Sequence, residues 1–342
     1  MKAVVLHPPH ELRIDDLPPA EPGPHQVRVR IRNGGICGSD LHYYHHGGFG
    51  TVRVREPIVL GHEMAGIVES IGAGVTRVTV GDRVAVNPSL PCNTCKYCLE
   101  GAQQHCLDMR FNGSAMRMPH IQGGFRELLV CDQAQAVPAD MPLERAAFAE
   151  PLSVCLHAIR QAGPLLGRRV LVTGAGPIGV LCAMVARHAG AREIVITDLL
   201  DAPLALSRKV AADRTVNVAR DTTAMADYAR DKGHFDVAFE ASGSAMAVST
   251  AIASLRPTGT LVQVGNGAAE TAIPLNTLLA KEITLRGTFR FHAEFAMAVE
   301  LLARNAIDVA PLLTEIIPVD DAIRAFDLAT DRHRAMKVQI AL

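Results

Sequence analysis

The pattern of hydrophobic and polar positions changes character at about residue 143. Before that point, short segments of alternating or β-branched apolar residues lie between connections rich in glycine and proline. Segments of this kind predict the strands of a mostly antiparallel, barrel-like β domain. The clearest predicted strands are residues 26–32, 66–71, 83–88 and 125–131.

From about Leu143 onward, alanine-rich helical stretches alternate with compact apolar strands. Strands that alternate with helices of this length predict right-handed βαβ units, and hence a doubly wound parallel sheet covered on both faces. The alternation fades after Leu285, and the last residues end in a strand-like segment, 336–340. The predicted strands of the sheet are residues 169–174, 193–198, 214–218, 236–241 and 260–265.

A chain of 342 residues is long enough for two domains of ordinary size. The pattern therefore predicts an α/β protein with a β-rich domain over residues 1–147 and a parallel-sheet domain over 148–286. We expect the segment 287–342 to return to the first domain. No repeat or low-complexity tract interrupts this organisation.

The charge balance excludes several classes of partner. The formal net charge is −1, without a long run of either sign, whereas nucleic acids and anionic membranes select concentrated Lys and Arg. No 18-residue apolar run occurs, and the first residues, MKAVVLHPPHELRID, lack the apolar core of a signal peptide. We therefore expect a cytoplasmic protein with no nucleic-acid and no membrane partner.

A dinucleotide-binding loop is predicted where a strand ends in GAGPIG. Gly174, Gly176 and Gly179 follow the apolar segment RRVLVT and precede an amphipathic helix. In that context the first glycine permits a tight turn, the second the approach of a pyrophosphate, and the third close packing of helix and strand. Pro177 and Ile178 complete the loop, and we add Val264, after a later strand, to the predicted cofactor-binding residues.

The next strand ends in Asp198, about 20 residues beyond the glycines. An acid at this position accepts hydrogen bonds from the adenosine ribose and repels a 2′-phosphate. No Lys or Arg lies between Leu199 and Ser207 to offset its charge. The sequence therefore predicts NAD as the cofactor in preference to NADP.

Four of the eight cysteines form a compact metal-binding pattern within a lobe at about residues 87–110. Four thiolates in one short loop close a tetrahedron around Zn²⁺ and leave no open position, so the predicted site is structural. The alternatives are a redox pair or inert thiols. The predicted ligands are Cys92, Cys95, Cys98 and Cys106.

A second metal site is predicted from dispersed residues. Cys37 lies in the segment GGICGSDLH, His62 and Glu63 lie in GHEMAG, and Glu150 lies in FAEP. One Cys, one His and one carboxylate hold Zn²⁺ with a position free for substrate, as in catalytic zinc sites. Each residue alone has an ordinary structural explanation, and only the combination indicates a metal.

These motifs together resemble the zinc-dependent medium-chain alcohol dehydrogenases. The segment from Gly61 to Val75 is similar to their zinc signature, and the similarity runs from end to end of the chain. Within that superfamily the chain resembles the sorbitol (polyol) dehydrogenase branch. The segments GGICGSDLHYY, NPSLPCNTCKYCLEG, DMRFNGSAM and GTFRF are similar to those of L-idonate 5-dehydrogenases.

The resemblance implies a GroES-like catalytic domain joined to a Rossmann domain, usually in homodimers or homotetramers. It implies Cys37 and His62 as catalytic zinc ligands, with either Glu63 or Glu150 as the carboxylate nearest the metal. By the same resemblance, Ser39 takes the substrate proton and His42 passes it to solvent. Glu150 is also a candidate catalytic residue.

The resemblance also places residues in the substrate pocket. Tyr43 and Arg290 match positions that line it, whereas Phe291 departs from the tyrosine that polyol enzymes often carry. A sugar acid requires a cation for its carboxylate, and Arg110, Arg117 and Arg290 are the candidates.

The expected reaction is hydride transfer from a secondary alcohol of a small sugar acid or polyol to NAD, with two zinc ions per chain. We expect oxidation of L-idonate to 5-keto-D-gluconate. The alternatives are a sorbitol or xylitol dehydrogenase, a threonine 3-dehydrogenase or butanediol dehydrogenase, and a non-enzymatic NAD-binding sensor. A zinc-free quinone reductase is disfavoured because the chain carries the cysteine, histidine and glutamate set.

Overall fold

The computed structural model describes residues 1–342, and the chain divides into two compact units. The first unit comprises Met1–Glu150, Phe291–Asp331 and Lys337–Leu342, and the second comprises Pro151–Arg290 and Arg332–Met336. The main divisions fall after residues 150 and 290, where the sequence predicted them after 147 and 286. The short segment at 332–336, which the sequence did not separate, belongs to the second unit.

The first unit is built on a seven-stranded sheet in the order β12-β8-β7-β3-β20-β19, in which β11 also pairs with β3. Every pairing is antiparallel except that of β19 with β20. Three smaller sheets, β2-β1-β6, β4-β5 and β9-β10, complete this unit. The seven strands are β3 (Gln26–Gly35), β7 (Glu63–Ile71), β8 (Arg83–Val86), β11 (Leu128–Asp132), β12 (Ala136–Pro138), β19 (Leu313–Pro318) and β20 (Lys337–Ala341). The shorter ones are β1 (Lys2–Leu6), β2 (Leu12–Asp16), β4 (Gly48–Phe49), β5 (Val52–Arg53), β6 (Ile58–Val59), β9 (Ser89–Leu90) and β10 (Arg110–Phe111).

The central strands of this sheet follow from their alternating sequence. In β3, Val27, Val29 and Ile31 are fully buried, and they join the core cluster that β7 and β8 also supply. The four strands predicted in this half are confirmed as parts of β3, β7, β8 and β11. The predicted terminal strand is β20, which pairs antiparallel with β3, so the end of the chain rejoins the first unit.

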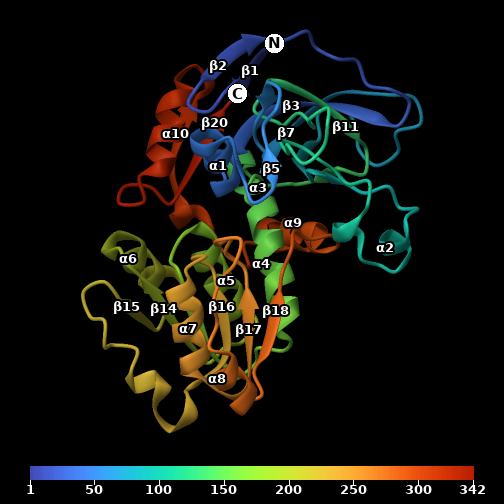
Figure 1. Ribbon diagram of the computed structural model, residues 1–342. Helices are drawn as coiled ribbons and strands as arrows, with labels where there is room; N and C mark the ends of the chain where they lie inside the picture. Colours follow the sequence, from blue (N-terminus) through green and yellow to red (C-terminus); the bar gives the residue numbers. More distant parts are fainter. The chain divides into compact units, whose positions relative to one another are not determined.

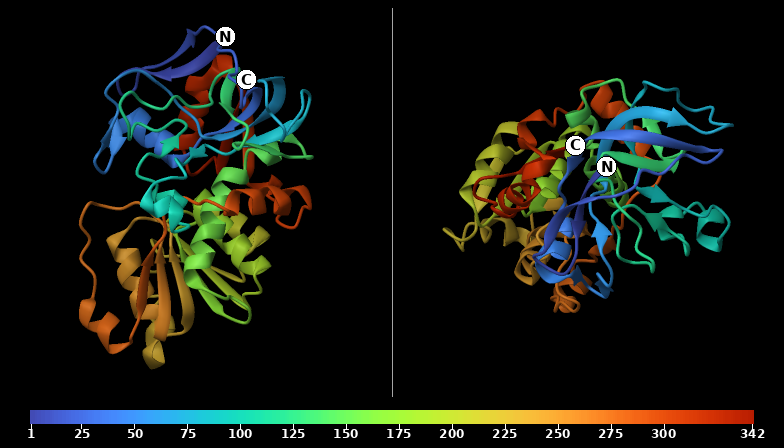
Figure 2. Two further views of the ribbon diagram at one scale, coloured as in Figure 1. Left: turned by 90° about the vertical axis from the view of Figure 1, so that its right-hand side faces the viewer. Right: turned by 90° about the horizontal axis from the view of Figure 1, so that it is seen from above.

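The second unit is a six-stranded, fully parallel sheet in the order β15-β14-β13-β16-β17-β18. Counted from its own first strand, this is the order 3-2-1-4-5-6 of dinucleotide-binding folds. Figure 1 shows the sheet with its strands side by side, and Figure 2 shows helices on both of its faces. The strands are β13 (Arg169–Thr173), β14 (Glu193–Asp198), β15 (Arg214–Asn217), β16 (Phe235–Glu240), β17 (Leu255–Gln263) and β18 (Thr284–Gly287).

Five of these six strands are confirmed predictions, and β18 is the one that the sequence pattern missed. It is four residues long, lies at the edge of the sheet, and all of its residues are exposed. An edge strand without a buried face carries no continuous apolar run, which is the signal that marked its neighbours.

The helices of both units are short to medium in length. None of them combines the length and the apolar character that a bilayer-spanning helix needs. In the first unit the helices are α1 (Gly38–His46), α2 (Lys96–Leu99), α3 (Leu143–Ala146), α9 (Glu294–Ala303) and α10 (Ala322–Thr330). The others are α4 (Ala149–Ala162), α5 (Pro177–His188), α6 (Asp201–Val210), α7 (Ala245–Ser254) and α8 (Leu275–Ala280).

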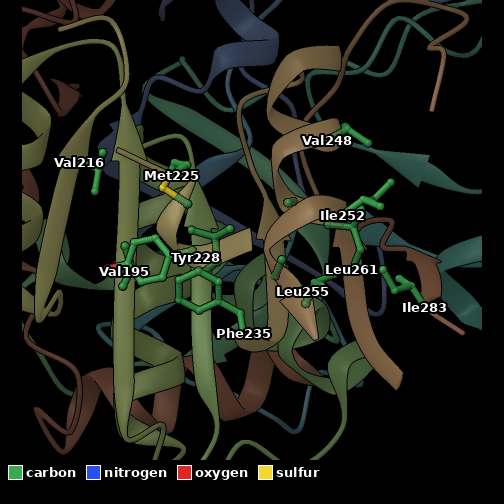
Figure 3. Close-up of a cluster of buried hydrophobic side chains, with 13 residues drawn as sticks. Val195, Val216, Met225, Tyr228, Phe235, Val248, Ile252, Leu255, Leu261 and Ile283 are labelled. Carbon is green, nitrogen blue, oxygen red and sulfur yellow. The ribbon is translucent and has the colours of Figure 1, made fainter. Parts of the chain in front are cut away.

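A buried hydrophobic cluster packs on one face of the parallel sheet (Figure 3). Leu255, Leu261 and Phe235 are fully buried in it, and Ile252 of α7 packs among them. Burial of a large apolar side chain contributes about 1.5–3 kcal/mol. This core fixes the strands whose carboxyl ends carry the dinucleotide loop.

Candidate functional site

The structure brings together Cys37, His62 and Glu63, whose ligand atoms all lie within 4.8 Å of one another. Cys37 is the residue that caps α1, Glu63 is the first residue of β7, and His62 directly precedes that strand. Two segments of chain, 37–46 and 62–71, therefore supply the whole group. Cys37 is half-buried, whereas His62 and Glu63 are 5% and 1% exposed.

Asp40, a residue that the sequence analysis did not select, lies next to the ring of His62. Asp40 is fully buried and accepts hydrogen bonds from the backbone N–H groups of Cys37 (3.0 Å) and Gly61 (3.2 Å). Its Oδ1 lies 3.6 Å from Nδ1 of His62, while Nε2 of the same ring lies 3.4 Å from the hydroxyl of Ser39. This contact is longer than a hydrogen bond, but a carboxylate on the far side of a histidine ring is typical of metal-binding histidines.

The surroundings of His62 are suited to a cation. Burial alone would lower its pKa, but the charges of Asp40 and Cys37 hold the pKa of His62 well above its usual value. A divalent metal bound by a histidine ring and a thiolate takes advantage of the same negative surroundings. The donor set of sulfur, nitrogen and oxygen therefore fits zinc.

Glu63 forms a buried ion pair with Lys337 of β20. The Nζ atom of Lys337 lies 2.7 and 2.8 Å from the two carboxylate oxygens and also donates to the carbonyl of Ile36 at 3.1 Å. The side chains of Lys337 and Glu63 are 4% and 2% exposed. A Cβ atom on the neighbouring Gly35 would lie 2.0 Å from Glu63 Oε2, so only glycine leaves room for this carboxylate.

Glu150, the other candidate carboxylate, lies outside the group that can share one ion with Cys37. It is 6% exposed, and burial raises its pKa to about 7, opposed by the charge of His62. A carboxyl group with that pKa is partly protonated near neutral pH. The structure therefore groups Glu63 with the two other ligands, and direct ligation by either glutamate stays a prediction.

Ser39, His42 and Tyr43 all lie on α1. Ser39 and His42 are three positions apart, so they share one face of the helix. Ser39 is half-buried next to His62, whereas His42 is exposed, and partial desolvation together with His46 lowers the pKa of His42. Tyr43 is 2% exposed and its hydroxyl oxygen accepts a hydrogen bond from Ala115 N–H at 3.2 Å.

The predicted arginines occupy different environments. Arg117 is ion-paired with Asp108, and Arg110 is exposed on β10 while its neighbour Phe111 packs against the His62 ring at 5.7 Å. Arg290 has a left-handed backbone (φ +53°), and its guanidinium lies 4.9 Å from the centre of the Phe289 ring. The role of Arg110 and Arg117 as substrate ligands stays a prediction.

The four cysteines of the predicted lobe also converge. The sulfur atoms of Cys92, Cys95, Cys98 and Cys106 all lie within 4.8 Å of one another, and those of Cys95 and Cys98 are 3.6 Å apart. A tetrahedron with ~2.3 Å zinc–sulfur bonds has edges of about 3.8 Å, so the spacing fits a closed zinc site.

Hydrogen bonds to sulfur support the same assignment. The backbone N–H of Cys92 and that of Asp108 both donate to Cys106, at 3.2 and 3.3 Å. Hydrogen bonds from Thr94 and from the backbone lower the pKa of Cys92 to about 6, whereas burial raises the pKa of Cys98 to about 12. A coordinated metal deprotonates such a thiol outright.

The glycine loop after β13 has the geometry that the sequence predicted. Gly174 has φ +94°, a conformation that other residues rarely adopt, and a Cβ on Gly179 would lie 1.9 Å from the Gly174 carbonyl oxygen. Nothing lies within 4 Å of a Cβ placed on Gly176, so this side of the loop is open to a ligand. Gly176 caps α5, whose first residue is Pro177, and Ile178 follows in its first turn. Phosphate groups bind at helix N-termini of this kind.

Asp198 lies at the carboxyl end of β14 and is hydrogen-bonded to this loop. Its Oδ2 accepts from Ala175 N–H at 2.7 Å, and its Oδ1 accepts from Leu199 N–H at 2.7 Å. Val264, also predicted to contact the cofactor, follows the carboxyl end of β17 and donates its N–H to the carbonyl of Glu240. Ligands of open parallel sheets bind at this edge.

Four polar residues of these sites escaped the sequence analysis. Asp40 and Lys337 lie beside the candidate ligands His62 and Glu63. Glu240 is fully buried and accepts hydrogen bonds from Gly243 N–H and from Gln263, and Arg332 forms an ion pair with Asp198 at 2.7 Å. Asp40 lies in the segment already selected for Cys37, so a closer reading of that motif would have found it. Nothing in the local sequence marks the other three.

Comparison with known proteins places the chain in a family. The family model of the alcohol dehydrogenase GroES-like domain matches residues 23–142, and that of the zinc-binding dehydrogenase matches residues 177–304. L-Idonate 5-dehydrogenase (NAD(P)(+)) of Escherichia coli K12 is 45% identical over 314 residues, which are 91% of this chain and 90% of that protein. D-Xylulose reductase A of Aspergillus niger is 37% identical over 94% of this chain and 92% of its own length.

A solved structure agrees with these relatives. The crystal structure of L-idonate 5-dehydrogenase from E. coli matches with a TM-score of 0.94 and 41% identity, over 100% of this chain and 98% of that one. The GroES-like and Rossmann fold class expected from the sequence is thereby confirmed. The chain belongs to the zinc-dependent medium-chain alcohol dehydrogenases, and it is an oxidoreductase of small-molecule substrates that uses zinc and NAD.

Proposed function

We propose that this dehydrogenase oxidises L-idonate to 5-keto-D-gluconate by hydride transfer to NAD. The observation that carries the proposal is the 45% identity to an L-idonate 5-dehydrogenase over 91% of the chain. The site agrees with it, because the Cys37–His62–Glu63 group, of which His62 and Glu63 are buried, lies next to a serine hydroxyl on α1. When bound, zinc supplies a Lewis acid that acidifies an alcohol hydroxyl, and NAD accepts the hydride.

The chain's own residues would handle the proton. The hydroxyl of Ser39, 3.4 Å from the His62 ring, is placed to receive a proton from a hydroxyl group held at this site. His42 lies one turn further along α1 and is exposed, so it can pass the proton to solvent. The carboxylate of Asp40 lies 3.6 Å from the His62 ring on the side away from Ser39.

Recognition of a sugar acid needs a cation that a neutral polyol does not. Among the candidates, Arg117 already has a carboxylate partner in Asp108, and Arg110 points to solvent on β10. We therefore assign the substrate carboxylate to Arg290, whose guanidinium can bind both oxygens at once. The left-handed backbone at Arg290 supports a functional role, since strained conformations are retained where they position a side chain.

A substrate panel tests this proposal. NADH absorbance is followed with L-idonate, sorbitol, xylitol, L-threonine and 2,3-butanediol, using the wild type and the variants Arg290→Ala and Arg110→Ala. We expect the highest kcat/KM with L-idonate, and a loss of about tenfold or more for Arg290→Ala with L-idonate alone. Arg110→Ala tests the other exposed candidate, and a loss confined to Arg110→Ala would assign the substrate carboxylate to Arg110 instead. A much higher kcat/KM with sorbitol or xylitol would assign the chain to the polyol dehydrogenases, as the similarity to D-xylulose reductases also allows.

We further propose a homodimer or homotetramer in the cytoplasm. The exposed edge strand β18 and the nearby Leu275 and Leu279, which are 63% and 72% exposed, offer unpaired backbone groups and apolar area to a second copy. Light scattering coupled to size-exclusion chromatography tests the assembly. A monomer at micromolar concentration would exclude it.

A further inference from the structure

The carboxylate that is predicted to bind the adenosine ribose carries a cation from a distant part of the chain. Arg332 follows α10 and precedes β20, and its Nη2 lies 2.7 Å from Oδ2 of Asp198. The Asp198 side chain is 3% exposed, whereas that of Arg332 is 50% exposed. The guanidinium thus covers the acid and still faces solvent.

Asp198 has no spare acceptor position while this ion pair is formed. Oδ1 accepts from the N–H groups of Leu199 (2.7 Å) and Leu200 (3.1 Å), and Oδ2 accepts from Ala175 N–H (2.7 Å) and from Arg332. An ionised carboxylate offers about four lone-pair sites. A ribose hydroxyl can therefore bind Asp198 only by displacing a donor, and the half-exposed Arg332 is the donor free to move.

A 2′-phosphate on the ribose meets a different situation. An uncompensated aspartate at this position repels it, which is the usual basis of NAD preference. Here Arg332 compensates the charge of Asp198 and keeps further N–H donors of its five available, and arginine binds phosphate through two parallel hydrogen bonds. The same side chain can thus neutralise the acid and contact the phosphate.

We infer that Arg332 is the residue of this chain that binds the 2′-phosphate of NADP(H) beside Asp198. The inference refines the proposed function, and it rests on that function only through the dinucleotide site. The sequence predicted NAD preference because no basic residue follows Asp198 closely. Arg332 supplies that basic residue from 134 positions away.

Binding of small nucleotides tests the inference without any substrate. Isothermal titration calorimetry is run with adenosine 2′,5′-bisphosphate and with 5′-AMP on the wild type, Arg332→Ala, Arg332→Lys and Arg334→Ala. We expect Arg332→Ala to weaken the bisphosphate by about tenfold to a hundredfold, as loss of a charged hydrogen-bonding group does. Its affinity for 5′-AMP should not fall, because the ribose hydroxyl no longer has to displace Arg332 from Asp198. Arg332→Lys should bind the bisphosphate with intermediate affinity, and Arg334→Ala, at an exposed position, should change neither affinity.

Two results would overturn the inference. If 5′-AMP and the bisphosphate weaken equally in Arg332→Ala, the arginine only supports the structure around Asp198. If the wild type does not bind the bisphosphate more tightly than Arg332→Ala does, the arginine does not contact a 2′-phosphate. Failure of the L-idonate assignment leaves both measurements unchanged, so the two proposals can fail separately.

Discussion

The four-cysteine lobe and the Cys37–His62–Glu63 group place metal-binding side chains in opposite ways. The lobe draws four sulfur atoms from residues 92–106, and backbone N–H groups of the same loop donate to them. The second group takes a sulfur, a nitrogen and an oxygen from two separate segments, and Lys337 from a third, distant segment pairs with Glu63. The four-cysteine lobe is formed within one short loop, whereas the Cys37–His62–Glu63 group is formed by segments that the fold brings together.

This difference indicates that the positions of metal-binding side chains do not by themselves define a functional site. In the lobe, backbone N–H groups of residues 92–108 donate to the sulfur atoms. In the second group, by contrast, Lys337 of β20 pairs with Glu63, while Asp40 of the Cys37 segment lies 3.6 Å from the ring of His62. We therefore expect changes in the lobe to affect stability, and changes in the second group to affect chemistry or the preorganisation of its ligands.

The largest effect is expected from His62→Ala. Loss of a ligand to the reacting metal removes several kcal/mol of transition-state stabilisation, so kcat/KM should fall by about 10³-fold or more. The melting temperature should change little in comparison, and zinc content should fall from two ions per chain to one. Metal analysis, NADH absorbance and thermal unfolding measure the three quantities.

A matched control for this variant is His25→Ala, at an exposed histidine outside the group. It should retain full activity and both ions. Full activity in His62→Ala would show that the reaction does not depend on the Cys37–His62–Glu63 group. That group could then no longer be assigned as the reactive site.

The sequence was informative where ligands were close along the chain or lay in a known arrangement of turns. The glycine loop and Asp198 were predicted because strand, loop and helix follow one another directly, and the hydrophobic core of β13 and β14 was visible as apolar runs. Lys337 and Arg332 could not be predicted in the same way. Their partners Glu63 and Asp198 are 274 and 134 residues away, and pairing over such distances depends on the whole topology.

The next largest effect is expected from Lys337→Met. This variant tests whether the Cys37–His62–Glu63 group depends on the pairing of Glu63 with a residue of distant β20. Removing one partner of a buried ion pair leaves the other charge uncompensated, which costs about 3–5 kcal/mol. Urea denaturation, after a chelator has removed the metal ions, measures the loss of unfolding free energy. The control is Lys2→Met, whose partner Asp320 is exposed, and it should leave the unfolding midpoint unchanged. Equal midpoints for the two variants would mean that the buried pair does not support the site.

The smallest of the three effects is expected from Cys98→Ser. This variant tests the structural role of the four-cysteine lobe. A tetrahedral site that loses one thiolate loses its metal, so zinc content should fall by one ion per chain and the segment 92–108 should become sensitive to protease. We expect the melting temperature to fall by about 5 °C, equivalent to ~2 kcal/mol for a domain of this size, while kcat at 20 °C changes less than about twofold. Cys131→Ala, at a buried cysteine of the β core, is the matched control and should keep both ions. If Cys98→Ser instead abolished activity at low temperature and left the melting temperature unchanged, the lobe would act on catalysis, and the division into a structural and a reactive site would have to be reversed.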